Sequence, residues 1–405
     1  METNINKKIF KLKGKVQHYA WGGKTYIPNL IHFNNTENKP CAEYWMGAHP
    51  SASSTLVIDG NDVLLTEIIA ANPSLVLTES IVNKFGELPY LYKILDVNEM
   101  LSIQVHPSKE EAAKGFEREE AAGIAINAFN RNYKDKNHKP EVMIALGEFW
   151  LLHGFMQLDA IEKRLQEIIE FNVFLPLFRK EGLKSLYKTI MELSQEEVDA
   201  VLASLIKTEM RRREAGELNK SMPGWWATKL FKPNDEIKNI DRGVFSIYLF
   251  NIVGLQKGEG IFQAAGVPHA YLEGQNVELM ANSDNVLRGG LTPKYIDVPE
   301  LMKHTLFEPV IPNVLKGDLA ENGERKYHCP VPDFSISKVE LLENQTYNNH
   351  SLTPEILLIV SGECAITSND TNMSAKSGET FFIYPNEKYN ITTTSHCDLY
   401  KAYVD

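Results

Sequence analysis

The amino-acid sequence predicts a mainly β fold interrupted by an α-helical insert. Three observations support this prediction. Short apolar runs and turn clusters fill the first 156 residues, an apolar period typical of helices follows, and apolar runs broken by glycine return after about residue 239. A chain of 405 residues exceeds what one hydrophobic core usually serves, so we expect several domains. We predict domain boundaries at 1–156, 157–238, 239–330 and 331–405.

Residues 1–156 are expected to form strands and loops with a few helices. Segments such as "YAWGGKTYIPN" and "HPSASS" are typical of turns between strands. The stretch "MLSIQVHPSKEE" alternates like a strand, with Gln104 and His106 on one face and Ile103 and Val105 on the other. An amide and an imidazole therefore project to the same side.

The segment 157–238 is expected to be all-helical. "LDAIEKRLQEIIEF" places Ile161, Leu165 and Ile168 or Ile169 on one stripe. Ser194 and the glutamate three residues later have the spacing of a capping box, which predicts the start of a second helix.

Two later β regions, 239–330 and 331–405, resemble each other. "GEGIFQAAGVPHAY" can be laid over "GETFFIYPNEKYNI" without a gap. This superposition aligns Gly258 with Gly378, Phe262 with Phe382, Gly266 with Asn386 and His269 with Tyr389. Glycine and asparagine both tolerate a left-handed backbone, so we expect the same turn in both copies.

A glycine-bounded apolar strand followed by a turn and a histidine resembles the second motif of the cupin superfamily, a small jelly-roll barrel. The resemblance implies two cupin-like jelly-roll barrels plus the helical domain. Only the first barrel retains the histidine, so only that barrel could hold a metal through this motif.

Charge and composition exclude several classes of partner. The formal net charge of −11 argues against a broad nucleic-acid footprint and against docking on anionic membranes. No apolar run reaches membrane-spanning length, and the N-terminal lysines precede no signal-like apolar segment, so we expect a cytoplasmic protein. The four cysteines are too sparse for a disulfide framework and are expected to be reduced packing residues.

Four polar residues point to a metal site. Gln104 and His106 share a strand face, Glu141 begins an apolar run that would bury its charge, and His269 follows the predicted turn. This mixed nitrogen and oxygen set suits zinc, although manganese, iron, cobalt or nickel could also occupy it. His138 competes as a ligand but ranks lower, because its neighbours "KDKNHKP" are typical of an exposed loop.

Five strings resemble type I mannose-6-phosphate isomerases: "QHYAWGG", "AEYWMGAHPSASS", "LPYLYKILDVNEMLSIQVHPSKEEA", "NHKPEVMIAL" and "PHAYLEGQNVELMANSDNVLRGGLTPKYIDV". The resemblance covers about residues 15 to 155 and 240 to 300, in family order. It implies one zinc ion per chain, a sugar-phosphate substrate, and interconversion of mannose 6-phosphate and fructose 6-phosphate. It also implies Gln104, His106, Glu141 and His269 as the zinc ligands, Arg288 as a catalytic residue, and a monomer.

An aldose–ketose isomerisation moves a proton between two carbons through an enediol, so the site needs an electrophile and an acid/base group. Candidates for the acid/base group are Lys139, Glu278, Asp284 and His49, and the sequence does not choose among them. Arg288 suits stabilisation of oxyanion charge better than proton abstraction, because a guanidinium stays protonated.

Substrate-binding candidates combine local cations, hydroxyls and aromatics. Each has a simpler interpretation, such as an outward strand lysine or a core aromatic. The candidates are Trp21, Lys93, Ser102, Tyr271 and Lys294. Glu43 is a candidate partner that orients a ligand histidine.

Two other classes of function compete with the isomerase hypothesis. A metal cupin acting on another sugar phosphate would share the barrel and the ligands without requiring "SDNVLRGGLTPK". A non-catalytic sugar-binding cupin predicts loss of ligands, whereas all four candidate ligands are present.

Overall fold

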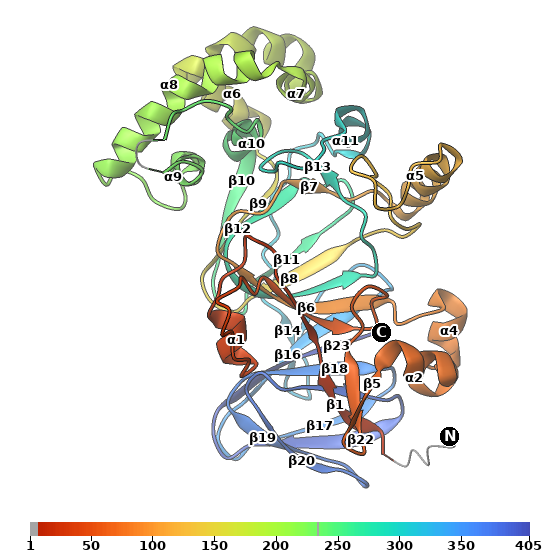
Figure 1. Cartoon of the computed structure of the whole chain (residues 1–405). Coiled ribbons are helices and arrows are strands. Elements are labelled where there is room, and N and C mark those ends of the chain that lie inside the picture. Colours follow the sequence, from red (N-terminus) through yellow and green to blue (C-terminus); the bar gives the residue numbers. More distant parts are fainter. Residues whose placement is uncertain (1–6, 233–234) are drawn as a thin grey trace.

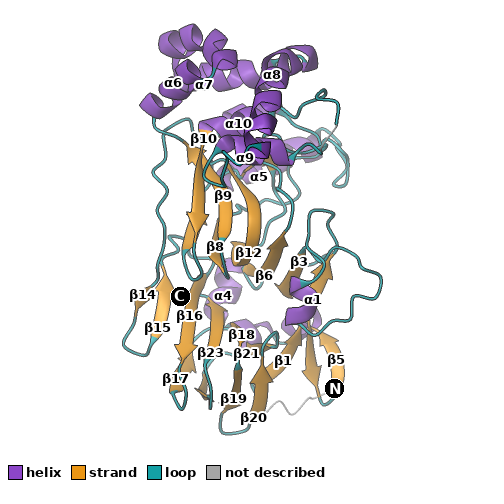
Figure 2. Ribbon diagram, turned by 90° about the vertical axis from the view of Figure 1, so that its left-hand side faces the viewer, coloured by secondary structure: helices purple, strands orange, loops and turns teal. Residues whose placement is uncertain are grey.

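Antiparallel sheets dominate the protein, which confirms the prediction of a β-rich fold (Figure 1). The computed structural model describes residues 7–232 and 235–405. The strands of three sheets fill the middle and one end of the molecule, and helices cover the other end (Figure 2).

A ten-stranded sheet carries all the strands that the sequence associates with metal binding. Its main path runs β10 (Phe250–Leu255), β9 (Phe149–Phe155), β12 (His269–Ala281), β6 (Tyr90–Val97), β3 (Glu43–Gly47) and β2 (Lys15–Gln17). Its other strands are β7 (Gln104–Val105), β8 (Glu141–Ala145), β11 (Gly260–Gln263) and β13 (Leu287–Arg288).

A nine-stranded sheet joins the two ends of the chain. Its order is β14 (Asp318–Leu319), β15 (Glu324–Tyr327), β16 (Ser335–Leu341), β23 (Cys397–Tyr403), β18 (Glu355–Ser361), β21 (Thr380–Ile383), β1 (Ile9–Lys13), β4 (Thr55–Ile58) and β5 (Asn61–Leu64). Strands β1, β4 and β5 therefore extend the sheet of the C-terminal region, although their residues lie within the segment 1–156.

A four-stranded sheet completes the β structure of the described residues. It consists of β17 (Thr346–Ser351), β22 (Glu387–Thr392), β19 (Glu363–Thr367) and β20 (Asn372–Lys376).

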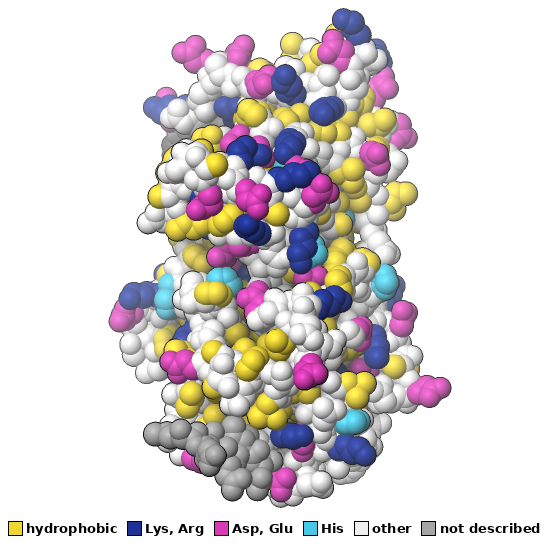
Figure 3. Space-filling model, turned by 90° about the vertical axis from the view of Figure 1, so that its right-hand side faces the viewer, with side chains coloured by type: hydrophobic (Ala, Val, Ile, Leu, Met, Phe, Trp, Pro, Cys, Tyr) yellow, Lys and Arg dark blue, Asp and Glu magenta, His cyan; other side chains and the backbone are white. Residues whose placement is uncertain are grey.

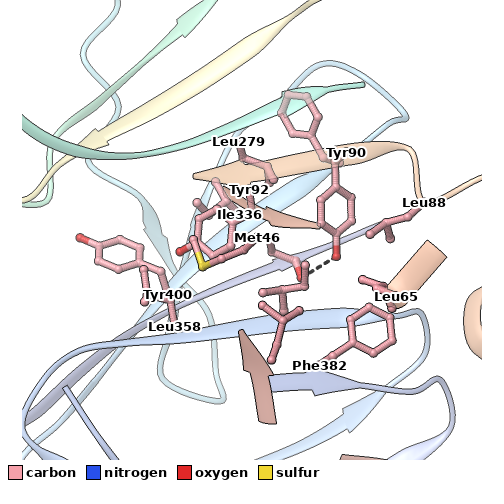
Figure 4. Close-up of a cluster of buried hydrophobic side chains, with 14 of the residues drawn as sticks. Met46, Leu65, Leu88, Tyr90, Tyr92, Leu279, Ile336, Leu358, Phe382 and Tyr400 are labelled. Atoms are coloured by element: carbon pink, nitrogen blue, oxygen red, sulfur yellow. Dashed lines mark hydrogen bonds between the residues drawn. The ribbon is translucent and has the colours of Figure 1, made fainter. Parts of the chain in front are cut away.

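One hydrophobic core spans the two large sheets (Figure 4). Met46 and Tyr92 come from the ten-stranded sheet, and Ile336 and Phe382 come from the nine-stranded sheet. The hydroxyl of Tyr90 donates to a backbone carbonyl of β23, the carbonyl of residue 402, at 3.2 Å. Burial of many large side chains at this junction fixes the two sheets against each other.

Six helices of the described residues lie among the strands. They are α1 (Tyr26–Leu30), α2 (Leu65–Ala71), α3 (Pro73–Leu77), α4 (Glu79–Phe85), α5 (Lys109–Ala121) and α11 (Val298–His304).

The described residues between β9 and β10 contain helices and loops but no strand. The helices are α6 (Leu158–Glu167), the 3₁₀ helix η1 (Ile169–Phe174), α7 (Leu175–Glu192), α8 (Gln195–Glu214), α9 (Pro223–Lys229) and α10 (Gly243–Leu249). In α6, Ile161 and Leu165 are buried as predicted, whereas Ile169 lies beyond the helix and is exposed. The predicted capping box is confirmed. The Ser194 hydroxyl accepts from the backbone N–H of Glu197, and the Glu197 carboxylate accepts from the backbone N–H of Ser194.

The predicted turn repeat is confirmed by the backbone. Gly258 and Gly378 have φ values of 84° and 83°, and Gly266 and Asn386 have φ values of 81° and 59°. All four residues lie in the left-handed region that glycine and asparagine tolerate. Gly258 and Gly266 flank the short strand β11, and Gly378 and Asn386 flank the short strand β21.

All four cysteines are free thiols, as predicted, and three of them are buried.

Candidate metal centre

Strand pairing and one turn bring three of the four predicted ligands together. Gln104 in β7 lies opposite His269, the first residue of β12. Glu141, the first residue of β8, lies opposite Gln263, the last residue of β11, and a turn leads from β11 to His269. Arg288 in β13 is the other cross-strand neighbour of Gln104. These pairings gather side chains that lie up to 165 residues apart in sequence.

His106, Glu141 and His269 form a buried group whose geometry fits a metal ion. The Nε2 atom of His106 lies 3.5 Å from one carboxylate oxygen of Glu141, and the Nε2 atom of His269 lies 3.4 Å from the other. Adjacent ligands of a tetrahedral zinc ion with bonds of about 2.0–2.1 Å are separated by about 3.3 Å. His106 Nε2 is fully buried and has no hydrogen-bond partner among the described residues, as expected of an atom that ligates a metal.

Hydrogen bonds fix both imidazole rings with Nε2 directed at Glu141. His106 Nδ1 lies 2.8 Å from the carbonyl of Asn285, and His269 Nδ1 lies 3.0 Å from the carbonyl of Val267. A carbonyl can only accept, so each Nδ1 carries a proton and Nε2 is the nitrogen of each ring that could bind a metal. Such backbone contacts are the usual way in which proteins orient metal-binding histidines.

Electrostatics keep the ligands in the protonation states that metal binding requires. Burial, aided by Lys139, lowers the pKa of His106 to about 4, so the ring is neutral at pH 7. Although burial opposes ionisation of Glu141, Lys139 at 3.2 Å and His106 hold the pKa of this carboxyl well below its usual range. A neutral imidazole and an ionised carboxylate are the forms that bind zinc.

A small cavity of about 50 Å³ adjoins this group, and Gln104, Lys139, Glu141 and His269 line it. Its volume suits an ion with one or two waters, since a water molecule occupies about 30 Å³ in the liquid.

Strand β7 ends at Val105, one residue before His106, so the strand is shorter than the sequence alternation predicts.

Lys93 forms the opposite wall of the cavity. Its ammonium lies 3.3 Å from Glu43 and 3.3 Å from Glu278, and also lies over the ring of Trp45. Glu278 accepts a 2.9 Å hydrogen bond from the Tyr271 hydroxyl. Burial and the charge of the ligand carboxylate raise the pKa of Glu278 to about 7. Lys93 is thus a buried, doubly paired lysine rather than an outward strand residue.

The prediction that Glu43 orients a ligand histidine is wrong for the described structure. Glu43 bonds to Lys93 and to the indole of Trp45, and no contact joins it to His106 or His269 among the described residues. The side chain projects from β3 towards Lys93 on β6, because these two strands are neighbours in the sheet.

Asp284 and His49 form a pair beside the cavity rather than on its lining. The Nε2 atom of His49 lies 3.6 Å from the Asp284 carboxylate, and that carboxylate is nearly half exposed. Burial lowers the pKa of His49.

Arg288 and Lys294 supply positive charge near one another. Burial lowers the pKa of Arg288, and burial together with Arg288 and Lys134 lowers the pKa of Lys294. These three cations therefore feel one another's fields. Over the rest of the face that carries α4 and α5, basic and acidic side chains are interspersed (Figure 3).

Three other candidates lie outside the ligand group. Trp21 is half-buried and stacks on Tyr19 with ring centroids 6.0 Å apart. Ser102 precedes β7 and is half-buried. His138 lies 3.0 Å from Asp333, so its lower rank as a ligand agrees with the structure, although it is largely buried rather than exposed.

Sequence reasoning missed the residue that holds the His106 ring. Asn285 is fully buried, and its side chain binds the backbone of residues 134, 135 and 137. Asp135 returns the contact by accepting from Ser283 at 2.8 Å and from the backbone of Asp284 at 2.7 Å. These bonds join the segment before Glu141 to the segment before Arg288. The string "SDNV" contained the signal, but the atom that contacts His106 is a backbone carbonyl, which any residue would supply.

The fold and site together define a β-rich protein with a buried group of two histidines and one carboxylate that could hold a metal ion. A sequence profile for the catalytic domain of type I phosphomannose isomerase matches residues 9–158, and the mannose-6-phosphate isomerase of Salmonella typhimurium is 39% identical over 93% of this chain and 95% of its own. The chain therefore belongs to the type I phosphomannose isomerase family.

Other relatives agree with this assignment. The mannose-6-phosphate isomerase of Escherichia coli is 38% identical over 97% of this chain and 99% of its own. A crystal structure of the Salmonella typhimurium mannose 6-phosphate isomerase with fructose 6-phosphate and zinc covers 98% of this chain and 100% of its own, with a TM-score of 0.87 and 36% identity. In the part of this chain that the structure describes, no helix is both long and apolar enough to cross a membrane.

Proposed function

We propose that this protein is a zinc-dependent isomerase that interconverts mannose 6-phosphate and fructose 6-phosphate through an enediol. The observation that carries the proposal is the buried group of two imidazoles and one carboxylate, in which both Nε2 atoms lie within 3.5 Å of the Glu141 carboxylate oxygens. Membership of an isomerase family supplies the reaction class.

His106, Glu141 and His269 would hold the zinc, and Gln104 would supply the fourth ligand from β7. When bound there, zinc would stabilise negative charge that develops on the sugar oxygens during enolisation. Lys139 would balance the Glu141 carboxylate and also present an ammonium to the cavity.

Proton transfer requires a group that exchanges a proton near neutral pH. Glu278 and Lys139 both line the cavity, whereas Asp284 and His49 do not. Of these, Glu278 is the group whose pKa burial and the Glu141 charge raise to about 7 in the metal-free protein. We therefore favour Glu278 for the proton relay, with Lys139 as the competing group and the Asp284–His49 pair beside the cavity. The Tyr271 hydroxyl would orient the Glu278 carboxylate.

The phosphate would lie outside the cavity, because about 50 Å³ cannot hold a six-carbon sugar phosphate. Arg288, next to Gln104 in the sheet, and Lys294 would bind it. Ser102 and Trp21 would contact the sugar, and Lys93 would neutralise the acidic wall that the substrate passes.

We also propose that the β regions form two cupin-like jelly-roll barrels and that residues 157–238 form a helical domain inserted into the first barrel. The first barrel would comprise 1–156 and 239–330 and the second 331–405, with β1, β4 and β5 completing the sheet of the second barrel. The repeated left-handed turns support the two-barrel division. We expect a cytoplasmic protein. We also expect a monomer, and sedimentation analysis would test this oligomeric state.

A coupled assay of mannose 6-phosphate conversion, with bound metal quantified before and after chelation, tests the function. We expect activity to disappear when the chelator removes one equivalent of zinc per chain, and to return when zinc is added again. The His106→Ala variant should lose both zinc and activity, whereas His138→Ala, a matched histidine change outside the site, should retain both. A zinc-loaded but inactive protein would favour a metal cupin acting on another sugar phosphate. A protein that binds no metal would favour a sugar-binding cupin without catalysis.

A further inference from the structure

A second and much larger cavity lies behind the strand that carries Glu43. Its volume is about 680 Å³, within the range of about 300–1,000 Å³ typical of small-molecule sites. We call it the basic cavity, and its charged and aromatic lining consists of Lys11, Lys13, Lys15, His18, His32, Phe33, Tyr44, Lys376 and Glu379. Strand β1, the residues after α1 and the end of β20 form its walls, and these elements lie near one another in Figure 2.

The strand period explains why lysines gather there. Lys11 and Lys13 alternate along β1, so their side chains project to the same side of that strand, and Lys15, the first residue of β2, lines the same cavity. Lys376 approaches from β20, at the other end of the chain. Among the described residues, four lysines and one carboxylate thus line this cavity in a protein of formal net charge −11.

Two of the lysines are available for a ligand. Lys11 is paired with Glu379 at 2.6 Å, and Lys13 with Asp62 at 2.7 Å. Lys15 and Lys376 are exposed and form no ion pair with any residue that the structure describes.

The histidines and an aromatic ring add further contacts. His18 uses Nδ1 on the carbonyl of Pro40, and His32 uses Nε2 on the carbonyl of Ser377, which leaves one nitrogen of each ring for a ligand. Phe33 is 44% exposed and offers an open ring face. The neighbouring hydroxyl of Tyr44 accepts from the backbone of Gly14 at 2.7 Å and is held in place.

We propose that the basic cavity binds a phosphate monoester that carries a planar ring, such as a nucleoside monophosphate. Lys15 and Lys376 hold the phosphate, which ammonium groups bind as compact point charges. Phe33 contacts the ring of the ligand. Tyr44 separates Glu43 from Trp45 in β3 and faces this cavity, while its two neighbours contact Lys93, so the ligand lies on the opposite side of the strand from the metal centre.

Titration calorimetry with adenosine 5′-monophosphate tests the proposal on the full-length protein, and it does not depend on the isomerase activity. We expect one site in the unmodified protein and a tenfold or greater rise in Kd in Lys15→Ala/Lys376→Ala. The Lys15→Gln/Lys376→Gln variant should give the same rise, and equal thermal unfolding midpoints should show that both proteins are folded. The matched control is Lys163→Ala/Lys180→Ala, which removes two helix lysines whose side chains are 72% and 81% exposed.

The other variants separate this site from the metal centre and from bulk charge. Arg288→Ala should bind the nucleotide as the unmodified protein does, and adenosine without phosphate should bind at least tenfold more weakly. Loss of binding in Arg288→Ala with none in Lys15→Ala/Lys376→Ala would place the nucleotide at the metal centre and overturn the proposal. An equal loss in the control variant, or no binding at millimolar nucleotide, would also overturn it.

Discussion

Replacing Lys93 by methionine should expose the energetic role of the wall beside the metal cavity. Methionine keeps the length and apolar stem of lysine but removes the ammonium that lies 3.3 Å from both Glu43 and Glu278. The lysine side chain is 7% exposed, and the two carboxylates are 10% and 4% exposed, so water cannot replace the lost charge. The variant therefore leaves two buried carboxylates without their shared cation.

The size of the effect follows from these distances. At 3.3 Å, each ion pair has a Coulomb attraction of about 5 kcal/mol at an effective dielectric constant of about 20. Removing one partner of a buried ion pair typically costs about 3–5 kcal/mol of unfolding free energy. We expect a loss in that range for the metal-free protein at pH 8.

The loss should be smaller at pH 6 because Glu278 can take up a proton. Its pKa in the folded protein is raised from 4.5 to about 7, so the folded state binds more protons than the unfolded state between these values. Stability therefore falls as pH rises through this window. Without Lys93 the pKa of Glu278 rises further, and protonation at pH 6 removes one of the two uncompensated charges.

Urea unfolding of the chelated protein at pH 6 and pH 8 measures both effects. The control is Lys180→Met, which replaces a lysine whose side chain is 81% exposed and should change stability by less than about 0.5 kcal/mol. Equal losses in the two variants, or a Lys93→Met loss that does not depend on pH, would refute the reasoning.

Three further predictions concern other parts of the molecule. Asn285→Ala should weaken zinc binding by about 10–100-fold in chelator competition, because its side chain ties together the two segments that position the ligands; unchanged affinity would contradict this role. Although burial opposes ionisation of Glu300, hydrogen bonds from its neighbours lower its pKa to about 2, so its contribution to stability is complete above pH 4.5 and is lost as pH falls towards 2. In Glu300→Gln, the unfolding free energy should fall by about 1–2 kcal/mol less between pH 4.5 and pH 2 than in the unmodified protein, a range that allows for screening by solvent. An unchanged fall would argue against this role of Glu300. Gly378→Ala should lower the free energy of unfolding measured in urea by at least about 3 kcal/mol, because φ is +83° and a Cβ would lie 1.7 Å from the Leu30 carbonyl oxygen. The control is Gly60→Ala, which has a similar φ but no clash and should lower this free energy clearly less.

Much of the site could be predicted from the sequence because each of its residues departs from the pattern around it. Glu141 stands at the head of an apolar strand, and His269 follows a turn that glycine marks. The contacts that orient the ligands could not be predicted in the same way. Asn285 and Val267 act through backbone carbonyls, and the chemical identity of a residue says little about where its carbonyl points.

The pairing of Lys93 with two carboxylates also depended on tertiary structure. On a strand that alternates, a lysine usually projects outward, but both faces of β6 are buried. One face packs in the core shared with the nine-stranded sheet, and the other face packs around the metal cavity. Glu43 and Glu278 reach Lys93 from the neighbouring strands β3 and β12, and their register is set by the sheet rather than by local sequence.

The sequence alone determined the β-rich class, the start of α8, the repeated left-handed turns and the four candidate ligands. These features follow from local rules: side-chain periodicity, capping and the backbone freedom of glycine and asparagine. Only the tertiary structure decided that the N-terminal strand β1 pairs with β21, and that lysines from both ends of the chain line the basic cavity. Pairing between distant strands depends on how whole sheets pack, and no local pattern records which strand will lie beside which.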